Sequence, residues 1–229
     1  MTAEPLPPEP SPDCPLCPRL AQFRADNRAA YREFHNAPVP SFGPTDAELL
    51  IVGLAPGLKG ANRTGRPFTG DYAGDLLYRT LLDCALAAGS YDRRPDDDLR
   101  LVRCRVTNAV RCVPPENKPT PAEARTCRRF LEGEIRSLTK LKVVLALGRV
   151  AHDAVVAAAG GRPSAFRFAH GVLHELPNGL RLVDSYHCSR YNTQTGVLTP
   201  EMFRDAVATA LDQIESSATA RRSRGSAGR

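Results

Sequence analysis

The stretch LLIVGLAPGLKGANRTGRPFTGDYAG, residues 49–74, passes from an apolar run through a glycine-rich loop to the start of a helical pattern. The run LLIVG is typical of a buried strand, and leucines at helical spacing predict a helix over residues 72–88. The loop between them carries three cations before its first acid: Lys59, Arg63, Arg66 and then Asp71. A strand, a glycine-rich loop and a helix in this order predict the first unit of an α/β fold.

The rest of the chain continues this alternation. Alternating or apolar runs predict strands over residues 101–107 and 142–148, and GVLHELPNGLRLVDSYH predicts a hairpin or a pair of short strands. Further helices are predicted over residues 18–36, 121–139, 149–159 and 200–215. Thr120, followed by proline and with Glu123 close behind, is typical of a helix start. This order of elements predicts a mostly parallel sheet inside a three-layer α/β/α sandwich.

Length and composition indicate an ordinary globular protein. The chain has 229 residues, of which 42% are hydrophobic and 24% charged, so we expect a single domain over residues 1–215. No apolar run approaches the ~20 residues of a membrane helix. The proline-rich start does not resemble a secretory signal, so the sequence predicts a cytoplasmic protein without a membrane partner.

Much of the net charge of +6 is concentrated at one end of the chain. Residues 216–229 hold four arginines and no acid, and without them the net charge falls to +2. Small, polar and basic residues predict a disordered tail. A solvated tail without a role is the favoured interpretation, and weak attraction to phosphates is the alternative.

Three loops are predicted to leave the carboxyl edge of the sheet, where open α/β sheets bind their ligands. They are GLAPG after the first strand, TNAVRC after the second and SYHCSR after the last, and they collect Phe68, Asp71, Asn108 and His187. The glycine-rich loop matches neither of two common nucleotide-binding patterns, GxxxxGK[ST] and GxGxxG. Its backbone N–H groups are still suited to a phosphate or an oxyanion.

Each of these side chains also has a purely structural interpretation. Phe68 either stacks on a nucleic-acid base or fills the space under its loop. Asn108 either reads the edge of a base or forms a strand-end turn. Asp71 is a candidate for proton transfer and equally a candidate N-cap of the helix that starts near Tyr72. His187 is by default a surface or structural histidine.

Seven cysteines in a chain without a secretory signal argue against a framework of disulfides. Four of them, Cys14, Cys17, Cys112 and Cys127, could hold a tetrahedral zinc ion or a [4Fe–4S] cluster. Their spacing fits a zinc ribbon poorly, and for the second pair packing and ligation stay equally open. Cys188 is either an activated nucleophile or a small residue that fills a loop, and we favour the second interpretation.

Three motifs together resemble those of a known family. GLAPGLKGANRTGRPFTGD, TNAVRCVPPENKPTP and HCSRYNTQTG follow one another in the order of the uracil-DNA glycosylase superfamily. They are most similar to family 5, the type b enzymes with an iron–sulfur cluster. The resemblance covers the chain from about Cys14 to Phe203, and it is specific because each motif is long.

The resemblance implies a fold, an activity and a cofactor. The fold would be an α/β/α sandwich around a four-stranded sheet. A [4Fe–4S] cluster with a structural role would be bound by Cys14, Cys17, Cys112 and Cys127. The activity would be that of a monofunctional DNA glycosylase, which hydrolyses the N-glycosidic bond of uracil flipped out of DNA and initiates base excision repair. Relatives also remove other deaminated bases such as hypoxanthine, and the sequence does not rank these bases.

The resemblance also implies roles for single residues. His187 would stabilise the departing uracil, Phe68 would stack on it and Asn108 would bind its edge. Asp71 would orient or deprotonate water, or offset the charge of the sugar. The floor of the pocket would be formed by Gly53, Ala55 and Gly57. The predicted DNA contacts are Lys59, Arg63, Arg66, Ser189 and Arg190.

Two departures leave an alternative open. The GLAPG motif has no polar side chain to manage water, as in family 5, and Cys188 stands where relatives usually have proline. The alternative is a catalytically weakened protein that binds damaged DNA. A third and less favoured interpretation is a zinc-bearing nucleic-acid module. We expect a monomer that associates with the nucleoid.

Overall fold

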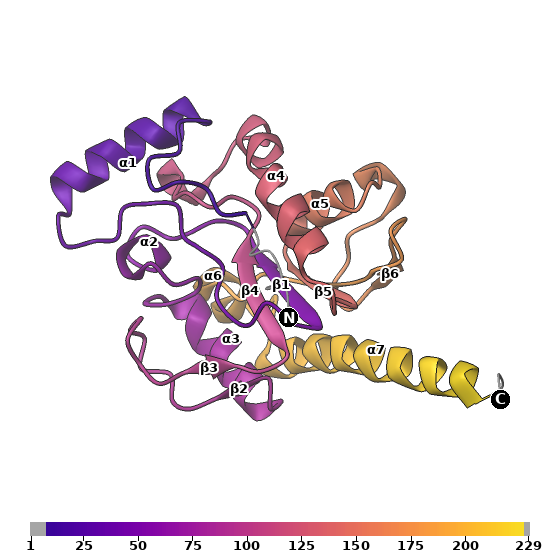
Figure 1. Ribbon diagram of the computed structural model, residues 1–229. Helices are drawn as coiled ribbons and strands as arrows, with labels where there is room; N and C mark the ends of the chain where they lie inside the picture. Colours follow the sequence, from indigo (N-terminus) through magenta and orange to yellow (C-terminus); the bar gives the residue numbers. More distant parts are fainter. Residues whose placement is uncertain (1–7, 227–229) are drawn as a thin grey trace, which may run out of the picture.

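A mostly parallel sheet forms the centre of the structure (Figure 1), a computed structural model that describes residues 8–226. Its strands lie in the order β4 (Cys104–Asn108), β1 (Leu49–Gly53), β5 (Val143–Leu147), β7 (Arg181–Ser185) and β6 (Leu173–Glu175). The first four are parallel, and β6 is antiparallel to β7. The parallel architecture is confirmed, but the sheet has five strands rather than four, because the predicted hairpin adds β6 to its edge.

Helices cover both faces of the sheet (Figure 1). One face is covered by α3 (Tyr72–Asp83) and α7 (Pro200–Ser226). The other is covered by α4 (Pro121–Ser137) and α5 (Arg149–Ala158). The predicted three-layer sandwich is therefore confirmed. The shorter elements are α1 (Pro18–Ala30), α2 (Ala61–Thr64), α6 (Arg190–Gln194), the ribbon of β2 (Ala87–Ala88) and β3 (Arg100–Leu101), and the 3₁₀ turns η1 (Pro115–Asn117) and η2 (Pro163–Ala165).

Strand β1 shows why the run LLIV forms the middle of the fold. Leu49 and Ile51 belong to the core beneath α3 and α7. Leu50 and Val52 belong to the core beneath α4 and α5. All four side chains are fully buried. A strand covered on both faces must be apolar at every position, so it lacks the alternation of a half-exposed strand.

Helix α4 begins where its sequence predicts. Thr120 Oγ1 accepts a hydrogen bond from the backbone N–H of Glu123 at 3.2 Å, and the Glu123 carboxylate accepts from the backbone N–H of Thr120 at 2.7 Å. This capping box satisfies two N–H groups that a helix start leaves open. The predicted N-cap is therefore confirmed.

The predicted strand over residues 101–107 is interrupted. Arg103 has a φ of +58° and separates the β2–β3 ribbon from β4. The alternation of residues 101–107 predicts Val102 on the apolar side of the strand, together with Cys104 and Val106, but Val102 is 40% exposed. Arg105 is buried, and its Nε donates to Glu134 at 2.8 Å. The same alternation predicts that Arg105 faces outward, but an ion pair with α4 holds it inside.

Three helix ends differ from the prediction. Helix α3 ends at Asp83 rather than at residue 88, and residues 87–88 form β2 instead. Helix α1 ends at Ala30 rather than at residue 36. Helix α7 continues past Glu215 to Ser226, so most of the segment predicted as a disordered tail is helical, while residues 1–7 and 227–229 lie outside the described part of the chain. Alanine and arginine are strong helix formers, and they extend a helix whose first turns pack against the sheet.

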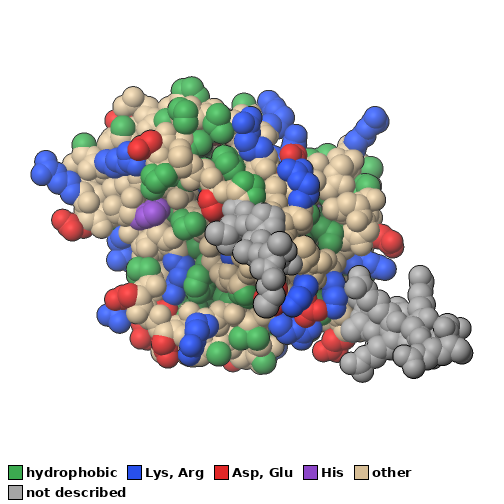
Figure 2. Space-filling view, in the orientation of Figure 1, with side chains coloured by type: hydrophobic (Ala, Val, Ile, Leu, Met, Phe, Trp, Pro, Cys, Tyr) green, Lys and Arg blue, Asp and Glu red, His purple; other side chains and the backbone are tan. Residues whose placement is uncertain are grey.

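One face of the molecule shows charges of both signs. On the face drawn in Figure 2, lysine and arginine side chains are interspersed with aspartate and glutamate. Within residues 8–226, no helix is long and apolar enough to cross a membrane.

Candidate active site

The loops after β1, β4 and β7 meet at one edge of the sheet and enclose a small pocket. Gly53 ends β1 beside Asn108, its register partner at the end of β4. The empty volume of the pocket, its open mouth included, is about 260 Å³. It is lined by Ala55, Pro56, Gly57, Ala61, Phe68, Asp71, Ala73, Asn108 and His187. The structure thus brings together the four side chains that the sequence singles out.

The missing side chain of Gly53 makes room for two of these residues. A Cβ at this position would lie 2.4 Å from Phe68 Cζ and 2.5 Å from Asn108 Oδ1. Both distances are far below van der Waals contact, so a glycine is required at this close approach. Gly53 is not among the residues that line the pocket, and its role is the space that it leaves for two of them.

Phe68 and His187 form two walls of the pocket. Their ring centroids are 5.9 Å apart, and their planes are inclined by 27°. The backbone carbonyl of His187 accepts a hydrogen bond from Asn192 Nδ2 at 2.8 Å, which ties this wall to α6. Burial lowers the pKa of His187 to about 4, so its imidazole is neutral near pH 7.

Two buried oxygen atoms at the pocket, Asp71 Oδ1 and Asn108 Oδ1, have no hydrogen-bond partner among the described residues. Because buried polar atoms are nearly always paired, these two are free to accept from a bound molecule. Asp71 occupies the N-cap position of α3, but its side chain makes no capping hydrogen bond. Burial raises the pKa of Asp71, and the backbone N–H groups of Gly74 and Ala73 oppose this rise without cancelling it.

The glycine-rich loop is shaped around the Asp71 carboxylate. A Cβ at Gly60 would lie 2.1 Å from Asp71 Oδ2, and a Cβ at Gly57 would lie 3.0 Å from the same atom. Side chains at these positions would push the carboxylate out of its place. The loop therefore packs closely around an acid at the edge of the sheet.

Arg66 differs from the other cations of this loop. Lys59 and Arg63 are exposed, as a contact with DNA phosphates requires. Arg66 is only 5% exposed, and its guanidinium makes a bidentate ion pair with Asp97 at 2.6 and 2.8 Å. The structure contradicts the predicted phosphate contact of Arg66, because a buried and paired guanidinium does not reach a DNA backbone.

Helix α6 follows the His187 wall of the pocket closely in the chain. Ser189, predicted as a DNA contact, caps this helix, and its Oγ accepts from the Asn192 backbone N–H at 3.3 Å. Arg190 is exposed and lies over the Tyr72 ring, 5.4 Å from the centroid. Cys188 is fully buried, and burial raises the pKa of its thiol. A packed, protonated thiol fits the space-filling interpretation rather than that of a nucleophile.

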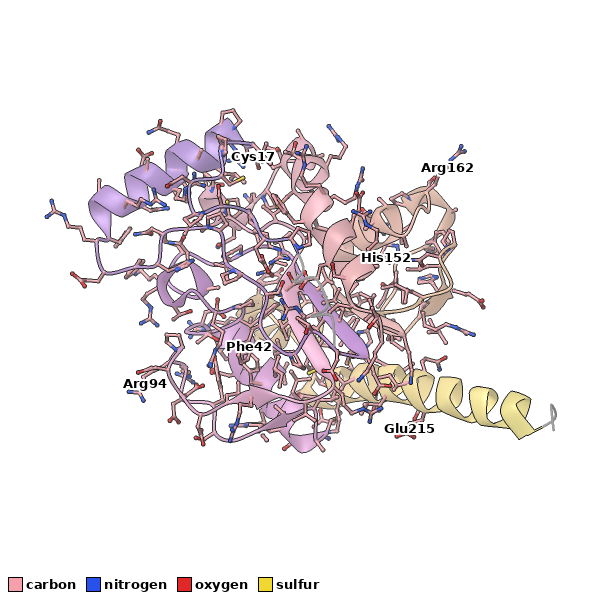
Figure 3. The ribbon with its side chains drawn as sticks, in the orientation of Figure 1. Cys17, Phe42, Arg94, His152, Arg162 and Glu215 are labelled. Carbon is pink, nitrogen blue, oxygen red and sulfur yellow. The ribbon has the colours of Figure 1, made fainter. Side chains whose placement is uncertain are left out.

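A second pocket, between α1 and α4, is lined by the four cysteines predicted as ligands. These are Cys14 and Cys17 ahead of α1, Cys112 after β4, and Cys127 within α4. Its empty volume, its open mouth included, is about 330 Å³. Figure 3 marks Cys17 at the start of α1. Three distant segments of the chain thus bring their thiols to one place.

Nitrogen donors point at two of these sulfur atoms. Arg24 Nη1 donates to Cys112 Sγ at 3.7 Å, and the backbone N–H of Arg111 donates to Cys127 Sγ at 3.3 Å. All four thiols are free of disulfides. Cysteine thiolates that ligate iron–sulfur clusters commonly accept such hydrogen bonds, so the donor set fits a cluster.

Sequence patterns do not predict a cluster of two histidines, His152 and His174, around the buried Asp184 of β7. His152 Nδ1 lies 2.8 Å from Asp184 Oδ1, and His174 Nε2 lies 3.1 Å from Asp184 Oδ2. His152 Nε2 lies 3.0 Å from the Phe166 carbonyl, so both of its nitrogens face acceptors and both must donate. Burial alone would lower the pKa of His152 (labelled in Figure 3), but Asp184 raises it above its ordinary value. No local pattern connects these residues.

Related sequences identify the family. The family model of the uracil DNA glycosylase superfamily matches residues 40–211. The chain is 48% identical over 199 residues to a type-5 uracil-DNA glycosylase of Thermus thermophilus, which covers 85% of this chain and 90% of the relative. It is 43% identical over 201 residues to a type-5 enzyme of Mycobacterium tuberculosis (84% and 75%). A type-4 uracil-DNA glycosylase of Archaeoglobus fulgidus is 35% identical over 114 residues (49% of each). The chain belongs to the uracil DNA glycosylase superfamily.

Proposed function

We propose that the protein hydrolyses the N-glycosidic bond of uracil in DNA and leaves an abasic site, the first step of base excision repair. The observation that carries this proposal is the pair of unpaired buried oxygens, Asp71 Oδ1 and Asn108 Oδ1, beside the Phe68 and His187 rings. The type-5 relatives, which are named uracil-DNA glycosylases, support it. A base reaches such a pocket only after it leaves the DNA stack.

The walls of the pocket suit a flat ring with a polar edge. Phe68 offers an aromatic face, on which a stacked base gains about 1–3 kcal/mol. Asn108 Oδ1 is free to accept a hydrogen bond, and the amide nitrogen beside it donates. Uracil presents a ring N–H next to a carbonyl oxygen, so one amide satisfies both groups.

His187 stabilises the departing base. When the glycosidic bond breaks, its electron pair stays on uracil, and negative charge develops on the base oxygens. Because burial lowers the pKa of His187 to about 4, the neutral ring acts through an N–H hydrogen bond and not by transferring a proton. One donor of this kind contributes roughly 10²–10³ in rate.

Asp71 acts on the sugar side of the bond. The departing base leaves positive charge on the sugar, which a nearby carboxylate stabilises. Water then adds to the sugar carbon, and Asp71 accepts its proton. Asp71 is the acid among the residues that line the pocket, and its raised pKa makes it a stronger base than an exposed aspartate.

DNA is held at the rim of the pocket. Lys59 and Arg63 beside the glycine-rich loop, and Arg190 in α6, are exposed cations that would bind phosphates. Such contacts fix the position of the duplex without reading its sequence. A monomer that binds the chromosome in this way would be found with the nucleoid in the cytoplasm.

We also propose that Cys14, Cys17, Cys112 and Cys127 hold a [4Fe–4S] cluster. Support comes from the four free thiols that line one pocket and the N–H groups that face their sulfurs. When bound, the cluster would supply iron–thiolate bonds between three distant segments. The thiolates would fix the segment that leaves β4 directly after Asn108, which is a structural role rather than a step of the reaction.

A labelled duplex with a single uracil tests the activity. After incubation, alkali should cut the strand at the uracil, and an unmodified duplex should stay intact. A third duplex with hypoxanthine shows whether other deaminated bases are removed. Selective binding of the uracil duplex without alkali-dependent cutting would contradict the proposed hydrolysis and favour a damage-binding protein.

A further inference from the structure

The backbone of Phe68 needs support from its surroundings. Its φ is +52°, in the left-handed region that residues other than glycine rarely occupy. Such strained residues persist only where neighbouring groups hold them, and they gather at ligand clamps. Phe68 is the wall on which the base would stack, so the groups that hold its backbone also set the shape of the pocket.

Two tyrosine hydroxyls hold this turn. Tyr91 Oη donates to the Phe68 carbonyl at 3.1 Å, and Tyr78 Oη donates to the Pro67 carbonyl at 2.5 Å. Gly74 leaves the space that the Tyr91 hydrogen bond needs, because a Cβ there would lie 1.8 Å from the Phe68 carbonyl oxygen and 2.4 Å from Tyr91 Oη. The turn is therefore fixed by hydrogen bonds from two segments outside it.

Arg66 joins both tyrosines to the turn. Its guanidinium lies 5.0 Å from the ring centroid of Phe42 (labelled in Figure 3), 5.7 Å from that of Tyr78 and 5.8 Å from that of Tyr91. Its Nε donates to Thr69 Oγ1 at 2.8 Å, so the side chain reaches across the turn. A cation held between aromatic faces in this way is both attracted and immobilised.

Asp97 completes the group. Its carboxylate binds Arg66 and also accepts from the backbone N–H groups of Asp92 at 3.0 Å and Leu99 at 3.3 Å. Its side chain is fully buried. The same carboxylate therefore folds the loop between β2 and β3, which carries Tyr91, and anchors that loop to the turn.

We propose that Arg66, Asp97 and Tyr91 are positioning residues, which hold the Phe68 ring where it meets a flipped base. This role rests on the proposed function. None of the three lines the pocket, so each acts only through the turn. Arg66, predicted from the sequence to bind a phosphate, therefore has a positioning role instead.

A positioning role predicts different effects on the affinity for two kinds of DNA duplex. Binding of a duplex with a non-cleavable uracil nucleotide, such as a 2′-fluorinated one, requires Phe68 to meet the base. Binding of a duplex with an abasic-site analogue depends on backbone contacts alone. Loss of positioning weakens the first and leaves the second unchanged, whereas general damage to the fold weakens both.

Tyr91→Phe removes one hydroxyl and keeps the ring. We expect the non-cleavable uracil duplex to bind about three- to tenfold more weakly, the effect of one hydrogen bond, with a similar fall in single-turnover excision. Binding of the abasic duplex should stay unchanged. Asp97→Asn should have a larger effect, because it leaves Arg66 without its counter-charge. The control is Tyr31→Phe, since Tyr31 stacks on Phe34 outside this network.

Equal affinity of Tyr91→Phe and wild type for the uracil duplex would overturn the positioning role, and so would equal losses toward both duplexes. If Asp97→Asn does not fold, Tyr91→Phe still tests the positioning role, because this variant leaves the Arg66–Asp97 pair intact. A wild-type protein that binds uracil DNA without excising the base would contradict the proposed function alone. In that case the ratio of the two affinities still tests the positioning.

Discussion

The rings of Phe68 and His187 face each other with centroids 5.9 Å apart and planes inclined by 27°. One ring follows β1 and the other follows β7, two strands that β5 separates in the sheet. Phe68 is an apolar surface for stacking, and His187 is a neutral hydrogen-bond donor. A base held against the first is presented to the second, so recognition of the base and stabilisation of the leaving group occur in one place.

Replacement of Asp71 by asparagine should slow excision and stabilise the fold. Asp71 is half-buried, its Oδ1 is buried and unpaired, and burial raises its pKa. An acid whose pKa rises on folding destabilises the folded state at every pH above that raised pKa. Asparagine removes the charge, so we expect a higher melting temperature at pH 7, and an excision rate lower by about 10²-fold or more.

Calorimetry and single-turnover kinetics on Asp71→Asn test both halves of this prediction. The matched control is Asp46→Asn, because Asp46 is an exposed acid that pairs with Lys140. A lower melting temperature with unchanged excision would instead assign Asp71 the role of a helix cap.

Gly53→Ala should close the pocket without unfolding the protein. The new Cβ would lie 2.4 Å from Phe68 Cζ and 2.5 Å from Asn108 Oδ1, so both side chains must move. Displacement of reacting groups by about 1 Å costs roughly 10²-fold in rate. We expect a loss of this size in excision, with affinity for an abasic duplex retained. Wild-type excision by this variant would show that Phe68 and Asn108 do not hold the base.

Cys127→Ser should lose the visible absorption of an iron–sulfur cluster and lower the melting temperature. Cys127 lies in α4 and its thiol would join this helix to the segments before α1 and after β4. Iron and sulfide analysis, together with the absorption spectrum, measures the loss. Cys84→Ser is the control, because Cys84 follows α3 outside the cysteine pocket. An unchanged spectrum in Cys127→Ser would remove Cys127 from the ligand set. A colourless wild-type protein with bound zinc would show that the site holds zinc and not an iron–sulfur cluster.

The buried pair of His152 and Asp184 should make stability depend on pH. Burial alone would lower the pKa of His152, but the carboxylate raises it above 6.5. A base with a raised pKa stabilises the fold fully below its unfolded pKa, and this contribution is lost as pH rises through the folded pKa. Denaturation by urea should therefore show the free energy of unfolding falling as pH increases above about 6.5. His152→Gln should remove this fall, and an equal fall in that variant would refute the assignment.

The pocket could be predicted because its residues follow strand ends. In a parallel sheet the chain leaves each strand at the same edge, so Gly53, Asn108 and His187 are brought together whatever their separate contacts. The apolar run of β1 and the capping residues Thr120 and Glu123 are equally local signals, and they too were confirmed.

The groups that support the pocket could not be predicted, because their partners are distant in the chain. In a polar loop Arg66 looks like an exposed cation, and nothing in the sequence connects it to Asp97 in another loop. Arg105 likewise fits an outward-facing strand position until Glu134 of α4 is seen beside it. Burial of a charge is decided by such pairs, which only the folded chain brings together.

Release of free base under single-turnover conditions, by wild type and by His187→Ala, tests the central claim most directly. From a uracil duplex, we expect His187→Ala to release the base about 10²–10³-fold more slowly than wild type, with DNA affinity nearly unchanged. From a 5-fluorouracil duplex, whose base carries negative charge more readily, this difference should shrink. Equal rates of uracil release by the two proteins, or no release by wild type, would contradict the account.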